Sequence, residues 1–283
     1  MLAIVTDSTC DLNPAELKAL DVHRVPLYVA FKGKTHKDWV EISPKDIIAG
    51  VQAGADLPST SQPSPEDFSA AYRAAKAKGA TEILVVTISS ELSGTFQSAN
   101  LAAKEAGLPV AIVDSRGASA GVGWLVRQAA ALRAAGKPVA DIVATLDRLK
   151  AKQIVLFSVG TLEYLQKGGR VSRISALLGG MLNIRPILTL DDGKIVPAAK
   201  ARGTKKAIAE IVDRVRAHAA AHPGGLVLDF LHIQDEPAAQ TLRQAVKDAG
   251  IEFRDGQIYE IGAVIAAHVG PGTFGVYAHA TAG

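Results

Sequence analysis

Short apolar runs alternate with longer segments of helical character over the first half of this 283-residue chain. Residues 2–5, 83–88 and 109–113 are runs rich in Val, Ile and Leu, and each precedes a segment that we expect to be helical. Buried strands that alternate with helices are typical of layered folds with a parallel sheet. A further strand is expected at 22–31. The pattern therefore predicts an α/β fold whose N-terminal half contains a parallel sheet.

The second half has a different rhythm. Residues 185–190 and 194–198 flank Asp191-Asp192-Gly193, which indicates a hairpin. Further strands are expected at 153–159, 226–233 and 252–258, and helices at 161–170, 174–181, 204–218 and 236–249. This half is predicted to be a mixed-sheet α/β domain. We expect a domain boundary between residues 150 and 160, which gives two domains, 1–155 and 156–283.

Hydroxyl and acidic residues follow each of the three N-terminal strands. They are Thr6-Asp7-Ser8-Thr9-Cys10-Asp11, Ser89-Ser90 with Ser93 and Thr95 just beyond, and Asp114-Ser115. The carboxyl ends of parallel strands meet at one edge of a sheet, where ligands collect. The first turn of a helix also leaves backbone N–H groups unpaired and carries partial positive charge. The segment 89–95 therefore predicts a site for a carboxylate or phosphate, although Ser93 as an ordinary helix N-cap explains the pattern equally well.

Composition excludes several classes of function. The chain is 48% hydrophobic and 21% charged, with a net charge of +3, which is typical of a globular protein. Basic residues form no block, and only 5% of residues are aromatic, so nucleic acid is not expected as a partner. The single cysteine, Cys10, permits no internal disulfide. The N-terminus lacks the basic region and apolar core of a signal peptide, so we expect a cytoplasmic protein without a membrane span.

The sequence contains no motif that is typical of a cofactor site. No glycine-rich dinucleotide fingerprint and no P-loop is present, which removes support for nucleotide binding. No metal site is expected, because no histidine forms a convincing ligand pair with another His, Asp or Glu; the histidines are His23, His36, His218, His222, His232, His268 and His279.

A few residues remain as candidates, each with a plainer reading. Ser93 lacks the first glycine of a Gly-x-Ser-x-Gly nucleophile elbow, so a nucleophilic role is disfavoured. Thr60 and Ser61 lie in a proline-bound segment that also reads as an ordinary loop. Arg170 and Arg202 adjoin glycines that let the backbone bring a charge close to a partner, although both also read as solvated surface. His268, in an apolar glycine-rich run, reads as a ligand or as a core residue.

Seven segments together resemble the DegV family, in the family's order and over nearly the whole chain. They are 4–12 (IVTDSTCDL), 60–64 (TSQPS), 88–99 (ISSELSGTFQSA), 113–115 (VDS), 160–172 (GTLEYLQKGGRVS), 183–188 (NIRPIL) and 270–272 (GPG). Each motif alone is weak, whereas the ordered set is highly specific.

The resemblance implies a two-domain EDD-type fold with a long-chain fatty acid between the domains. Family members include the binding subunit of bacterial fatty acid kinase, which presents the carboxylate to a separate ATP-dependent kinase subunit for acyl-phosphate formation and phospholipid synthesis. By motif position, the carboxylate would be bound by Thr60 or Ser61, Ser93, the backbone N–H of Gly94, and His268. Arg170 and Arg202 would lie at the ligand mouth or contact the partner.

The resemblance also sets the expected ligand and the alternatives. The ligand is expected to be palmitate, stearate or oleate, with no cofactor, and transient contact with a membrane surface is compatible with this function. We expect a lipid-binding carrier rather than an enzyme. One alternative is an enzyme, either an acyl or phosphoryl transferase or a hydrolase, that uses Ser93 and His268. The other alternative is a pure interaction module. Candidate tunnel residues are Phe31, Phe96, Phe157, Leu177, Leu178, Met181, Ile265 and Phe274.

Overall fold

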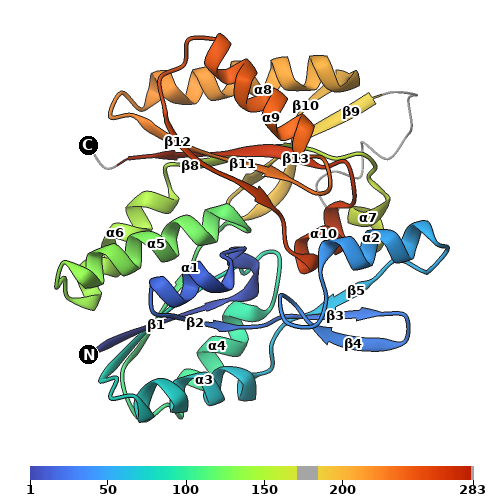
Figure 1. Cartoon of the computed structure of the whole chain (residues 1–283). Helices are drawn as coiled ribbons and strands as arrows, with labels where there is room; N and C mark the ends of the chain where they lie inside the picture. The colour runs from blue at the N-terminus through green and yellow to red at the C-terminus, as the bar shows by residue number, and fades with distance from the viewer. Residues whose placement is uncertain (171–183, 282–283) are drawn as a thin grey trace.

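A parallel four-stranded sheet forms the centre of the N-terminal half. The computed structural model describes residues 1–170 and 184–281. In Figure 1 the parallel sheet lies in the lower part of the molecule. Its strands, in spatial order, are β2 (Val22–Val25), β1 (Leu2–Asp7), β6 (Glu82–Thr87) and β7 (Val110–Asp114). Helices α3 (Pro65–Ala77) and α4 (Thr95–Ala103) cover one face, and α1 (Pro14–Ala19), α5 (Ala120–Ala134) and α6 (Val139–Lys150) cover the other. The predicted layered parallel sheet is confirmed.

A mixed six-stranded sheet forms the second half. Its strands, in spatial order, are β10 (Lys194–Arg202), β9 (Ile184–Asp191), β8 (Gln153–Ser158), β13 (Phe274–Ala280), β11 (Leu226–His232) and β12 (Arg254–Glu260). Among the described strands of this sheet, only β11 and β12 are parallel neighbours. Helices α8 (Gly203–Ala221) and α9 (Glu236–Asp248) cover the face turned away from the N-terminal half (Figure 1). The mixed sheet and the hairpin at Asp191-Asp192-Gly193 match the sequence pattern, while the division at residue 155 stays a prediction.

A small antiparallel sheet lies beside the parallel sheet in the N-terminal half (Figure 1) and was only partly predicted. It consists of β4 (Lys34–Lys37), β3 (Tyr28–Phe31) and β5 (Ser59–Ser61). The single strand expected at 22–31 is wrong, because β2 and β3 belong to different sheets. Pro26 has no N–H to donate to a ladder, and the N–H of Leu27 donates to Ser8 Oγ at 3.0 Å, so the chain leaves the parallel sheet here.

Helices α2 (Pro44–Gln52) and α10 (Ala263–Val269) pack on this small sheet. Val29 and Phe31 of β3, with Leu27 just before it, form one buried cluster with residues of α10, which belongs to the C-terminal half of the sequence. The other elements in the described ranges are a 3-10 turn at Ser8–Cys10 and α7 (Glu163–Lys167). The helix expected at 174–181 lies outside the described residues. Among the described helices, none has the length and apolar character that crossing a membrane requires.

Alternation along the central strand β13 separates two cores. Phe274, Val276 and Ala278 face α8 and α9, whereas Tyr277 faces the N-terminal half. Because successive side chains of a strand point to opposite faces, one strand serves both the helix-covered core and the interior surface between the halves.

Phe230 on β11 tests the helix-covered core. The side chain is 1% exposed and packs among the α8 and α9 residues. Phe230→Ala should lower the free energy of unfolding by about 3–5 kcal/mol, because it removes apolar contacts and leaves a cavity. Urea denaturation measures the loss. Leu101→Ala is the control, since Leu101 is 51% exposed and its truncation should change stability by less than about 0.5 kcal/mol. Equal effects of the two substitutions would contradict this packing.

Candidate functional site

An apolar cavity of about 240 Å³ lies between the two halves of the molecule. Its walls come from β8, β11 and β13 of the six-stranded sheet, from α10, and from the segments that follow β6 and β7. The apolar lining residues are Leu27, Ile88, Leu92, Ala118, Val155, Phe157, Leu190, Ile195, Leu231, Ile261, Val264, Ile265 and Val269. A lining of this kind suits a hydrocarbon group rather than a sugar or a nucleotide.

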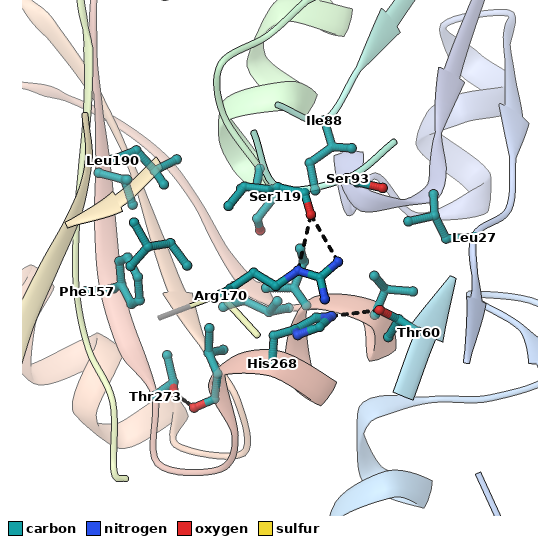
Figure 2. A pocket seen from close by; sticks show the side chains of 18 of the residues that line it. Leu27, Thr60, Ile88, Ser93, Ser119, Phe157, Arg170, Leu190, His268 and Thr273 are labelled. Carbon is teal, nitrogen blue, oxygen red and sulfur yellow. Dashed lines mark hydrogen bonds between the residues drawn. The ribbon is translucent and has the colours of Figure 1, made fainter. Parts of the chain in front are cut away.

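Polar side chains gather at one part of this cavity. Figure 2 shows Thr60, Ser93, Arg170 and His268 around it, and Ser61 also lines it. Thr60 and Ser61 lie on β5, and pairing with β3 sets Thr60 opposite Val29. His268 comes from the last turn of α10. Four segments that are far apart in the sequence thus supply the polar groups.

A hydrogen bond between Thr60 and His268 joins the two halves inside the cavity. Thr60 Oγ1 lies 2.7 Å from His268 Nε2, and the two residues are 208 positions apart in the sequence (Figure 2). Burial and the nearby charge of Arg170 lower the pKa of His268 to about 4, so the imidazole is neutral at pH 7. Its Nδ1 is buried and has no hydrogen-bond partner among the described residues. The imidazole is therefore placed to contribute hydrogen bonds rather than charge.

Arg170 supplies the positive charge of the site. Its Nε and Nη2 donate to the carbonyl oxygen of Leu92 at 3.3 and 3.2 Å, and Nη1 donates to the carbonyl of Gly168. Partial burial lowers the pKa of the guanidinium, which still leaves it charged at neutral pH. No carboxylate of the described residues lies within ion-pair distance of it. The cavity therefore contains a cation that an anionic ligand can pair with.

The turn after β6 contributes one hydroxyl, not four. Ser93 lines the cavity, and its Oγ lies 2.8 Å from Thr95 Oγ1. Ser89 Oγ donates instead to the carbonyl of Gly193, and Ser90 Oγ donates to Asp114. Two of the four hydroxyls expected to hold an anion thus bind other parts of the chain instead. The N-cap of α4 is Gly94 rather than Ser93, although Ser93 Oγ accepts a hydrogen bond from the N–H of Thr95 at 3.4 Å.

A polar groove of about 340 Å³ adjoins the cavity on this side. Ser93, Arg170, Leu92 and Ile195 line both the cavity and the groove. Gly94 lines the groove only, together with Ser90, Glu91, Gly169 and Lys194. The polar end of the cavity therefore lies next to a groove where a second reactant can approach.

Comparison with known proteins places the chain in a family. The sequence model of DegV, described as an uncharacterised protein family, matches residues 1–281. This chain belongs to the DegV family. A DegV domain-containing protein of Deinococcus radiodurans is 43% identical over 275 residues, which cover 97% of each chain.

Two solved structures resemble this DegV protein closely. A fatty-acid-binding DegV family protein from Thermus thermophilus is 45% identical and has a TM-score of 0.95 over 99% of each chain. A stearic-acid-binding protein from Eubacterium ventriosum is 25% identical, with a TM-score of 0.89 over 99% of this chain and 98% of the other. Both of these similar proteins are fatty-acid-binding proteins.

Some residues predicted from the sequence do not reach the cavity. Arg202 is exposed, next to α8, and is not a lining residue. Of the candidate tunnel residues, Phe157 and Ile265 line the cavity, whereas Phe31, Phe96 and Phe274 do not. Phe274 points to the α8 and α9 side because of the alternation along β13. Leu177, Leu178 and Met181 lie outside the described residues.

Several lining residues of this DegV protein were missed from the sequence. Tyr277 and Ser119 line the cavity, as do Gln62 and Thr273. Tyr277 accepts a hydrogen bond from the N–H of Ala118 at 3.2 Å. Alternation along β13 gives a weak signal for Tyr277. Ser119 follows the predicted polar strand end at Asp114-Ser115, but nothing local distinguishes it from its neighbours.

Substitution of Gly168 tests whether its close packing against His268 fixes the position of the imidazole. A methyl group on Gly168 would overlap His268 Nδ1 and lie 3.0 Å from the carbonyl oxygen of Tyr164. Gly168→Ala should therefore push the imidazole away and break the bond to Thr60, as seen in a crystal structure of the variant. Gly169→Ala is the control: the site has open space, so its positive φ should cost about 1–2 kcal/mol of stability without moving His268. An unmoved imidazole in Gly168→Ala would contradict this packing.

Proposed function

We propose that this DegV protein binds a long-chain fatty acid in the interdomain cavity. The carboxylate is held by Thr60, Ser61, Ser93, the N–H of Gly94 and His268, next to Arg170. One observation carries the proposal: an apolar cavity ends at hydroxyls, a neutral imidazole and a guanidinium that has no carboxylate partner among the described residues. This arrangement matches a ligand with one anionic end and an otherwise apolar body.

The physical chemistry of the ligand divides its binding between the two parts of the site. A buried carboxylate needs charge-assisted hydrogen bonds, because removing it from water without partners is costly. Each buried methylene contributes about 0.8 kcal/mol, so a sixteen-carbon tail gains roughly 12 kcal/mol before the losses of association are subtracted. The tail therefore sets affinity and the polar end sets orientation. Palmitate, stearate and oleate are the ligands proposed.

The groove beside the polar end suggests a second step after the fatty acid binds. Ser93 and Arg170 line both spaces, so a carboxylate held between them faces a groove open to another protein. In this proposal a separate ATP-dependent kinase subunit binds there and forms the acyl phosphate used in phospholipid synthesis. Exposed Arg202 is the proposed contact with that subunit. A cytoplasmic location with transient membrane contact fits such a carrier.

The hydrogen bonds of Ser93 and His268 do not favour a stand-alone hydrolase or transferase. A nucleophilic serine needs a base within hydrogen-bond reach, and the base needs an orienting partner. The partner of His268 Nε2 is Thr60 Oγ1, and its Nδ1 has no partner among the described residues. The oxygen of Ser93 is bonded to Thr95. The groups are arranged as a binding site.

Titration of the delipidated protein with palmitate and oleate tests the proposed ligand. The wild type should bind both, and Arg170→Gln should bind about tenfold or more weakly, because a charge-assisted contact is worth about 1.5–3 kcal/mol. Ser93→Ala should also weaken binding. Ser90→Ala is the matched control, since that hydroxyl donates to Asp114 and does not line the cavity. No binding by the wild type, or equal affinities in all four proteins, would rule out this site.

A separate assay tests the kinase partner. With ATP and a fatty acid kinase subunit, the wild type should yield acyl phosphate, and neither protein alone should. Arg202→Ala should keep its affinity for palmitate, because Arg202 does not line the cavity, but lose most acyl-phosphate formation. Lys200→Ala, at another exposed position of β10, is the control. Full product formation with Arg202→Ala would exclude the proposed contact.

A further inference from the structure

Helix α10 carries more of the cavity wall than any other single helix in the described part of the chain. Val264, Ile265, His268 and Val269 all line the cavity. Nε2 of His268 lies 2.7 Å from Oγ1 of Thr60, which belongs to the N-terminal half. The start of α10 must therefore be fixed relative to the N-terminal half.

Asp11 makes that connection. It follows the 3-10 turn after β1 and is only 2% exposed. Its Oδ1 accepts hydrogen bonds from the N–H of Gly262 at 3.1 Å and from Trp39 Nε1 at 3.3 Å. Its Oδ2 accepts one from Ser119 Oγ at 2.6 Å. Gly262 is the N-cap of α10, so a carboxylate of the N-terminal half satisfies a backbone donor just before the helix begins.

The fit around Gly262 is close. A Cβ atom at Gly262 would lie 2.5 Å from Asp11 Oδ1 and 2.5 Å from Trp39 Nε1, so a side chain there would force the segments apart. A second buried carboxylate, Asp38, accepts a hydrogen bond from the N–H of Val264 at 3.4 Å. Two side chains of the N-terminal half thus bind the backbone at the start of α10.

Burial makes this arrangement energetically unfavourable for a carboxylate unless the contacts compensate. Desolvation raises the pKa of Asp11 to about 7, and the neighbouring charge of Asp38 contributes to the rise. Three donors nevertheless converge on Asp11, from Gly262, Trp39 and Ser119. An apolar residue would pack here without that penalty but could not fix the backbone N–H of Gly262.

We propose that Asp11 is a positioning residue for the ligand site: it fixes the start of α10 against the N-terminal half and thereby places His268 opposite Thr60. Gly262 and His268 are six residues apart, or about 9 Å along a helix, so a shift at Gly262 is transmitted directly to the imidazole. The role of His268 toward the ligand rests on the proposed function, whereas the placement of its ring does not.

The first measurement therefore uses ligand-free protein and follows the imidazole of His268 by NMR as a function of pH. Arg170 is the charged group that faces this imidazole. In the wild type and in Asp11→Asn, whose amide oxygen still accepts from Gly262, the pKa should stay at about 4. In Asp11→Ala it should rise by about one unit or more toward the ordinary value of about 6.5, because a loosened α10 admits water. An unchanged pKa in folded Asp11→Ala overturns the proposal.

Two further variants serve as a control and as a replacement for Asp11→Ala in this pKa measurement. Asp229→Asn alters another buried carboxylate, which accepts from the N–H of Gln257 and contacts His279, and it should leave the pKa of His268 unchanged. A similar rise in Asp229→Asn would mean a general loss of packing and would overturn the proposal. If Asp11→Ala does not fold, Trp39→Phe is measured instead, because it removes one hydrogen-bond donor to Asp11. A rise in the pKa of His268 smaller than that expected for Asp11→Ala supports the proposal, whereas no rise overturns it.

The second measurement is the affinity for palmitate in a double-mutant cycle. Asp11→Ala should weaken binding by about tenfold in the wild-type background but by less than about twofold in His268→Ala, because the two residues act through one contact. Equal losses in both backgrounds overturn the positioning role. If the wild type fails to bind palmitate while the pKa of His268 responds as expected, the proposed function fails and the role of Asp11 stands.

Discussion

The site depends on the fixed position of α10 between the two halves of the molecule. This seven-residue helix packs on the small sheet through Ala263, Val264 and Ala267. It also presents Ile265 and His268 to the cavity. Carboxylates of the N-terminal half bind the backbone at its start, and Thr60 binds its last turn. The cavity keeps its shape because both ends of one short helix are held from the opposite half of the molecule.

The chemistry of the cavity restricts what can occupy it. Its wall is formed mainly by apolar side chains from both halves, so a ligand with polar groups along its length would bury them without partners. Its polar end contains one guanidinium, hydroxyls and an imidazole kept neutral by burial and by the neighbouring charge. A single anion on an apolar chain satisfies both parts. The fatty-acid-binding protein from Thermus thermophilus has the same fold over 99% of each chain.

The sequence predicted elements whose signal is local. Apolar runs such as 83–88 marked buried strands, and Asp191-Asp192-Gly193 marked a hairpin that the structure confirms. The break at Pro26 was missed because the deciding contact, between Leu27 and Ser8, joins residues 19 positions apart. The hydroxyls after β6 look alike in the sequence. Only their partners, Gly193 for Ser89 and Asp114 for Ser90, show that these two serve structure while Ser93 is left to the cavity.

The site itself could be predicted only as a set of candidates. Thr60 and His268 were singled out, but their contact spans 208 positions and arises from tertiary packing. Asp11 was read as part of a polar strand end, and nothing near it in the sequence points to Gly262. The most direct test of a fatty acid between the two halves is mass spectrometry of the protein as extracted from the expressing cells. We expect one fatty acid of the palmitate, stearate or oleate class per chain. Protein that carries no lipid, and that takes up none when incubated with palmitate, would contradict this account.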